Sequence, residues 1–170
     1  MISEKVQKLL NEQITKEFYS AYLYLDFSNY YANIGLKGFA SWYQVQTQEE
    51  RDHAMLFIQY MRRNGLKITL EAIAKPDKTF SDAKGPLTAA YEHECYVTSL
   101  IHTIYEAASQ DKDYRTMQFL DWFVKEQAEE EETASGLVQK WDLYGADPKS
   151  LFLLDQEMGK RTYSAPSLKL

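Results

Sequence analysis

The chain has 170 residues and a formal net charge of −6, from 19 lysines and arginines against 25 aspartates and glutamates. This length can bury a sizeable core in one domain or in two small ones. The acidic balance argues against a general nucleic-acid or anionic-membrane binder, because both depend on basic patches. The single Cys95 excludes an internal disulfide and a cysteine-based zinc or iron–sulfur site within one chain.

Residues 1–30 carry no signal-peptide pattern, and the sequence holds no run of about 18 apolar residues. We therefore expect neither export nor a membrane span, and we expect the protein to be cytoplasmic.

The first two predicted elements are long helices joined by a short turn. Ser3 is a typical start for a helix over about Glu4–Asn33, which contains no glycine or proline, and Gly35 then supplies a break. A second helix is predicted over about Leu36–Asn64, ending before Gly65. Because only two or three residues join them, these helices should be antiparallel neighbours.

An irregular stretch follows, over roughly Leu66–Gly85, with no clean hydrophobic period. About 20 residues of this kind are unusual inside a compact domain unless they cross from one end of a long bundle to the other. We therefore expect a crossover that makes the second and third helices parallel.

The second half of the chain predicts another helical hairpin and a short last helix. The third helix should start at Ser81 or Pro86 and reach Gln110, and after a tight turn the fourth should continue to about Tyr144. Residues 148–158 form a short amphipathic helix that begins at a proline. We expect a single domain over 1–160 and an extended or loose tail over 161–170.

Glu50 interrupts the apolar stripe of the second helix. At 100° per residue, Phe39 and Tyr43 fall within about 20° of it, and His53 lies about 60° away. An ionised carboxylate buried without a partner is costly, so Glu50 must be paired, protonated or bound to a cation. Glu-x-x-His also points two metal-ligand types the same way.

Matching groups occur in every long helix. Each hairpin offers one glutamate about 17 residues before its turn and two further groups about 16 and 19 residues after it. At 1.5 Å per residue these groups reach nearly the same height in the bundle. They are Glu17, Glu50 and His53 in the first hairpin and Glu94, Gln127 and Glu130 in the second.

A hidden repeat supports this pattern, because a shift of 77 positions carries Glu17, Glu49, Glu50 and His53 onto Glu94, Glu126, Gln127 and Glu130. One glutamate from each of two helices and a Glu-x-x-His pair from each of the others is the known arrangement of ferritin-like di-iron carboxylate proteins.

The chain resembles the bacterial non-haem ferritins over essentially residues 1–160. The motifs that carry the resemblance are Asn11-Glu12-Gln13 with Glu17, Gln48-Glu49-Glu50 with His53, and Glu126-Gln127-x-Glu129-Glu130. The resemblance implies an all-α fold: a ferritin-like four-helix bundle with a long crossover between helices 2 and 3 and a short fifth C-terminal helix.

The resemblance also implies a di-iron site. Glu17, Glu50 and His53 would hold one iron, and Glu50, Glu94 and Glu130 the second, so that Glu50 bridges the two. Further roles implied by the resemblance are a hydrogen-bond donor at Gln127, assistance to electron transfer by Tyr24, and a third iron site formed by Glu49, Glu126 and Glu129 with Glu130.

The implied function is iron storage with ferroxidase activity. Such a protein oxidises Fe²⁺ with O2 or H2O2 and deposits a ferric mineral inside a hollow homo-oligomeric shell of 24 chains, with the short last helix near the four-fold axes. Haem is not expected, because Asp52 stands where bacterioferritins have a haem-ligating methionine.

Three alternatives stay open. A non-storage di-iron peroxidase or oxidase of the rubrerythrin-like class is disfavoured by Gln127-x-x-Glu130, which replaces the second Glu-x-x-His. A Dps-like DNA-protecting protein is disfavoured by the fifth helix. A purely structural bundle would leave the matched ligand positions unexplained.

Overall fold

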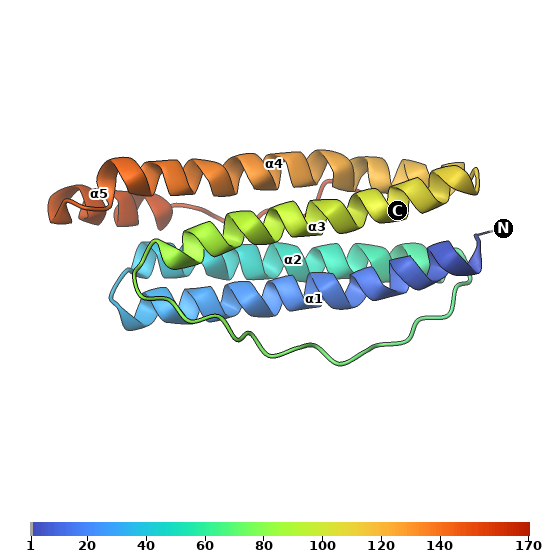
Figure 1. The fold of residues 1–170 in the computed structure, drawn as a ribbon, viewed down its shortest axis with the longest axis horizontal. Coiled ribbons are helices and arrows are strands. Elements are labelled where there is room, and N and C mark those ends of the chain that lie inside the picture. Colours follow the sequence, from blue (N-terminus) through green and yellow to red (C-terminus); the bar gives the residue numbers. More distant parts are fainter. Residues whose placement is uncertain (1) are drawn as a thin grey trace.

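The structure, a computed structural model, describes residues 2–170, and within these residues it contains helices and connections but no strand. The five helices are α1 (Glu4–Asn33), α2 (Lys37–Arg63), α3 (Gly85–Gln110), α4 (Tyr114–Tyr144) and α5 (Pro148–Met158). Helices α1 to α4 lie side by side as a long bundle, and α5 lies at the end where α1 turns into α2 (Figure 1). The predicted ferritin-like bundle with a short fifth helix is confirmed.

Local chemistry sets the helix boundaries. The side chains of Ser3, Asp113 and Asp147 cap the starts of α1, α4 and α5 by accepting hydrogen bonds from backbone N–H groups three residues on. Gly35 and Gly65 follow α1 and α2 with positive φ angles of 85° and 67°, a conformation that glycine adopts without steric cost.

The crossover between α2 and α3 runs along α1 for most of the bundle (Figure 1). Asn11 pairs with Thr69 through two hydrogen bonds, Nδ2 to the backbone oxygen at 2.9 Å and backbone N to Oδ1 at 2.8 Å. Near the other end, the hydroxyl of Tyr31 donates to the backbone oxygen of Ala83 at 2.7 Å. The crossover therefore returns the chain to the end of the bundle where α2 begins, and α3 runs parallel to α2 as predicted.

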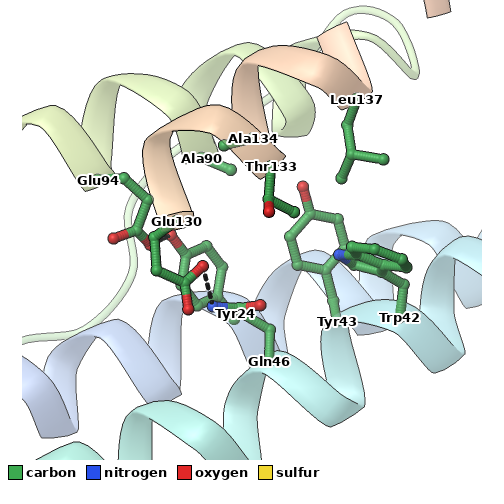
Figure 2. Close-up of a pocket in the computed structure, with 10 residues that line it drawn as sticks. All are labelled: Tyr24, Trp42, Tyr43, Gln46, Ala90, Glu94, Glu130, Thr133, Ala134 and Leu137. Atoms are coloured by element: carbon green, nitrogen blue, oxygen red, sulfur yellow. Dashed lines mark hydrogen bonds between the residues drawn. The ribbon is translucent and has the colours of Figure 1, made fainter. Parts of the chain in front are cut away.

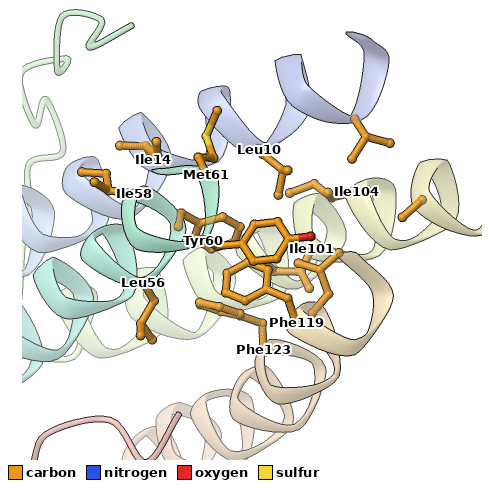
Figure 3. Packing of buried hydrophobic residues seen from close by; sticks show 14 of the residues in the cluster. Leu10, Ile14, Leu56, Ile58, Tyr60, Met61, Ile101, Ile104, Phe119 and Phe123 are labelled. Atoms are coloured by element: carbon orange, nitrogen blue, oxygen red, sulfur yellow. The ribbon is translucent and has the colours of Figure 1, made fainter. Parts of the chain in front are cut away.

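Two apolar clusters fill the bundle. The first apolar cluster includes Leu10, Phe57, Ile101, Phe119 and Phe123 (Figure 3). The second lies toward the α1–α2 turn and includes Leu23, Tyr31, Phe39, Leu87 and Leu137. The polar side chains of α1 to α4 that were expected to bind metal fall between these clusters along the sequence of each helix.

The tail after α5 is irregular, as expected, but it packs against the bundle. Trp122 Nε1 donates to Ser167 Oγ at 3.0 Å, and the hydroxyl of Tyr163 donates to the carboxylate of Asp52. Leu168 and Leu170 pack on the first apolar cluster. These contacts bring the tail back beside α2 and α4, and no pattern in the sequence predicts them.

In residues 2–170, none of the helices combines the length and the apolar character needed to cross a membrane.

Helix α5 is held tightly against the start of α2. Asp155 Oδ1 accepts a hydrogen bond from the backbone N–H of Phe39 at 3.0 Å. A Cβ atom added at Gly38 would lie 1.6 Å from the backbone oxygen of Asp155, so this contact requires glycine.

We expect Gly38→Ala to push α5 from α2 and to lower the stability by about 1–3 kcal/mol, the usual cost of overpacking. Gly136→Ala is the matched control, because a Cβ there has no neighbour within 4 Å and a helix-interior alanine should stabilise by about 0.5–1 kcal/mol. Thermal unfolding followed by circular dichroism checks both. Equal midpoints for Gly38→Ala and the wild type would contradict the packing argument.

Candidate metal centre

Two groups of three ligand-type side chains meet in the middle of the bundle. Glu17, Glu50 and His53 form one triad and Glu50, Glu94 and Glu130 the other, with one potential ligand atom from each member within 4.8 Å of the others. No third such group occurs among residues 2–170. Glu50 is common to both triads, so the two metal positions that they define would be neighbours.

Four different helices supply these side chains. Glu17 comes from α1, Glu50 and His53 from α2, Glu94 from α3 and Glu130 from α4. Their exposed fractions are 9% or less. Because each is anchored on a long helix between two packed apolar clusters, the site is held by rigid elements and not by loops.

Neutral amides hold the carboxylates in place. Gln13 Nε2 donates to Glu17 at 2.8 Å, and Gln46 Nε2 donates to Glu50 at 2.9 Å and to Glu130 at 3.0 Å. Figure 2 shows Gln46 reaching up from α2 toward Glu130. The amides orient the carboxylates without cancelling the negative charge that attracts a cation.

The fourth carboxylate, that of Glu94, receives two donors. Gln127 Nε2 lies 3.1 Å from Glu94 Oε2, in agreement with the hydrogen-bonding role expected for Gln127. The hydroxyl of Tyr24 donates to Glu94 Oε1. Tyr24 is buried and stacks on Tyr43 with 5.6 Å between ring centroids, so it joins the carboxylate directly to the second apolar cluster.

Sequence reasoning did not identify Gln13 and Gln46 as site residues. Both are buried, at 2% and 4% exposure. Their signal was available, because each lies four residues before a ligand-type glutamate on the same helix, the spacing at which side chains meet.

Burial raises the pKa of Glu17 and of Glu130 to about 7, and the negative charge of Glu50 adds to this effect. Burial also raises the pKa of Glu94 well above its usual range, and Glu50 and Glu130 raise it further. Without a cation, Glu94 therefore holds a proton at neutral pH and Glu17 and Glu130 are about half protonated there, since charged carboxylates at this separation repel each other.

Glu50 and His53 form the charged pair of the metal-free site. Burial opposes both charges, but the nearby imidazole lowers the pKa of Glu50, and Glu50, Glu17 and Glu130 raise the pKa of His53 to about 10. The pair is loose, with 3.5 Å between His53 Nδ1 and Glu50 Oε2.

Among residues 2–170, the buried atoms His53 Nδ1 and Glu17 Oε2 have no hydrogen-bond partner, because the 3.5 Å contact of His53 Nδ1 with Glu50 is an ion-pair contact without hydrogen-bond geometry. Buried polar atoms are nearly always paired, so two orphaned ligand atoms within one triad point to a missing partner. A set of carboxylate oxygens with one imidazole suits Fe²⁺ and similar divalent metals and also stabilises Fe³⁺, because carboxylates are hard anions.

A small cavity of about 20 Å³ lies beside the second triad, between Tyr24, Tyr43, Glu94 and Glu130 (Figure 2). This volume holds about one molecule of the size of water.

The three residues expected at a third iron site lie near one another, but their carboxylate oxygens are not among the groups of atoms that lie within 4.8 Å of one another. Glu49, Glu126 and Glu129 line one cavity of about 240 Å³ next to His53, and the tail forms one wall of it. Glu49 pairs with Arg161 of the tail, whereas Glu129 is exposed and lies 3.6 Å from Lys125.

Comparisons with known proteins agree with this geometry. A protein-family model described as a ferritin-like domain matches residues 7–144. The bacterial non-heme ferritin of Campylobacter jejuni is 38% identical, covering 92% of this chain and 93% of its own. That of Bacteroides fragilis is 40% identical, covering 95% of this chain and all of its own.

Among solved structures, an engineered closed form of the Archaeoglobus fulgidus ferritin superposes with a TM-score of 0.94. It is 43% identical and covers 96% of this chain and 100% of its own. The chain belongs to the ferritin family.

Proposed function

We propose that this protein stores iron and is a ferroxidase. Its substrates are Fe²⁺ and either O2 or H2O2, and its product is Fe³⁺ that is deposited as a mineral inside a shell of identical chains. Glu17, Glu50 and His53 bind one Fe²⁺, and Glu50, Glu94 and Glu130 bind the other.

The observation that carries the proposal is the sharing of Glu50 by two buried triads. One carboxylate with two oxygens can contact two metal ions at once, which holds them a few ångströms apart. Two Fe²⁺ ions at that separation can each give one electron to the same oxidant molecule, so no free one-electron product is formed. A cavity of about 20 Å³, the size of one water molecule, lies beside Glu94 and Glu130, where an oxidant would approach the second metal position.

The surrounding side chains have supporting roles in the proposal. Gln13, Gln46 and Gln127 orient the ligand carboxylates, and Tyr24 assists electron transfer from its position on Glu94. Glu49, Glu126 and Glu129, with Glu130, receive a third iron beside the pair.

The shell is proposed on two grounds. Relatives named as ferritins match nearly the whole chain. In addition, the single chain exposes large apolar side chains, with 70% exposure at Leu70 in the crossover and 61% and 58% at Phe152 and Leu153 in α5. Phe152 and Leu153 are adjacent in α5, and neighbouring exposed apolar side chains of this size favour a surface that another chain covers.

The first test follows iron during aerobic loading with Fe²⁺. We expect the wild type to retain far more than two irons per chain. Retention of only about two would instead support a non-storage di-iron peroxidase or oxidase.

In the same assay, Glu50→Gln should slow Fe²⁺ oxidation by at least about tenfold, because even a change beside a metal ligand commonly costs 10–100-fold. Glu92→Gln is the control, since Glu92 is exposed on α3 two residues before Glu94. Unchanged oxidation by Glu50→Gln would refute the proposed centre.

A second test uses pH. The pKa of Glu17 and of Glu130 is raised from 4.5 to about 7, and that of His53 from 6.5 to about 10, so the folded metal-free protein holds protons that the unfolded chain releases. The stability that these three groups contribute is then greatest at low pH and falls as the pH rises through their folded-state values, whereas the lowered pKa of Glu50 acts in the opposite direction only at acidic pH.

We expect the unfolding midpoint of the metal-free protein to fall by several degrees between pH 5 and pH 8, and Zn²⁺ to restore it at pH 8. The double variant Glu17→Gln with Glu130→Gln should flatten this dependence, whereas Glu92→Gln should keep it. A midpoint that rises over this range in the metal-free protein would contradict the assignment.

A third test is the mass of the particle. Because one chain has a mass of 19.8 kDa, a shell of 24 chains should sediment as a particle of about 475 kDa. Detection of monomers or dimers alone by analytical ultracentrifugation would refute the shell.

A further inference from the structure

Arg161, in the tail after α5, reaches into the cavity that Glu49, Glu126 and Glu129 line. Its guanidinium pairs with the carboxylate of Glu49 and donates a hydrogen bond from Nη1 to Gln46 Oε1 at 2.7 Å. It also lies over the ring of Trp42, 4.3 Å from the centroid. Its side chain is 18% exposed, so most of the charge is withdrawn from solvent.

A guanidinium is always charged and only donates hydrogen bonds. At Glu49 it therefore supplies the positive charge that a bound cation would supply. Among residues 2–170 the neighbouring carboxylates have longer contacts with cationic groups: Glu126 lies 3.9 Å from Nε2 of His53, and Glu129 lies 3.6 Å from the exposed Lys125.

Arg161 also fixes the orientation of Gln46. Because the guanidinium can only donate, the oxygen of the Gln46 amide must face it. The NH2 group of the same amide is then turned toward Glu50 and Glu130, to which it donates. A single arginine thus contacts the acidic cavity directly and two ligands of the metal centre through one amide.

We propose that Arg161 is the resident cation of the Glu49–Glu126–Glu129 cavity, and that a metal ion binding to Glu49 displaces its guanidinium. This inference rests on the proposed third iron position. Metal binding in the cavity is then a competition between a divalent ion and a tethered side chain. Departure of Arg161 frees the Gln46 oxygen, so occupation of the cavity is coupled to Glu50 and Glu130.

The tail could also hinder metal binding simply by closing one side of the cavity, without any contribution from the charge of Arg161. Tyr163 and Ser167 tie the tail to Asp52 and Trp122, and residues 164–167 form part of the cavity wall. The experiment must therefore separate the charge of Arg161 from the presence of the tail.

The probe is Zn²⁺, which is redox-inert, titrated calorimetrically into the metal-free full-length protein. We expect two tight binding events per chain and a weaker third. Arg161→Gln should tighten the third event by about tenfold or more, because it removes a competing ion pair that is mostly buried. The first two events should change far less.

Two variants serve as controls. Lys160→Gln removes the same charge from the neighbouring exposed position, and Tyr163→Phe with Ser167→Ala loosens the tail while it keeps Arg161. Neither should tighten the third event. An effect of the second control as large as that of Arg161→Gln would show that the tail acts as a cover, and would overturn the proposal.

Trp42 provides a second readout. Displacement of the guanidinium from its ring should change the tryptophan emission during the third event in the wild type, and this change should vanish in Trp42→Phe and in Arg161→Gln. Unchanged third-event affinity in Arg161→Gln would overturn the proposal. If the wild type instead showed no tight binding of the first two Zn²⁺ ions, the proposed di-metal centre itself would be overturned.

Discussion

The structure depends on burying four carboxylates and an imidazole at one level of a helical bundle. Apolar clusters lie on both sides of this layer, so the charges lose most of their hydration. Two effects lower the free-energy cost of burying this layer without metal. Glu50 and His53 form a charged pair, and the raised pKa values of Glu17, Glu94 and Glu130 favour their protonated, neutral forms. The same layer holds the two triads of potential ligand atoms, so the constraint that makes it costly to fold without a countercharge also makes it suited to a cation.

Glutamine solves a second problem in this layer. Each carboxylate needs a hydrogen-bond donor to keep its orientation, but a lysine or arginine in the centre would compete with the metal for it. Gln13, Gln46 and Gln127 donate hydrogen bonds without adding charge. The guanidinium of Arg161 is kept one step away, where it reaches Glu50 only through the amide of Gln46.

Hydrophobic period and spacing predicted the helices and the central side chains because both are properties of single helices. The observed starts and ends lie within a residue or so of those expected, and α3 begins at Gly85, close to the later of its two predicted starts. Glu17, Glu50, His53, Glu94 and Glu130 lie together because equal distances from two turns give equal heights. The tail was different. Its irregular residues have no period, and Arg161 meets Glu49 across 112 positions of sequence, so only the tertiary structure brings the two together.

The internal repeat of 77 residues places polar side chains of the site at matching positions in both halves of the chain, but it does not repeat the amides of Gln13 and Gln46. The position that corresponds to Gln13 is Ala90, and the one that corresponds to Gln46 is Phe123. The carboxylates of the second half therefore receive hydrogen bonds from other amides. Gln46 on α2 donates to Glu130, and Gln127 donates to Glu94. Gln127 stands at the position that corresponds to Glu50 in the repeat. A glutamate at 127 would add a fifth carboxylate and leave Glu94 with one donor fewer. The two triads are thus unequal by construction. The first has its own imidazole as a countercharge, whereas the second depends on borrowed amides, one of which is oriented by the tail.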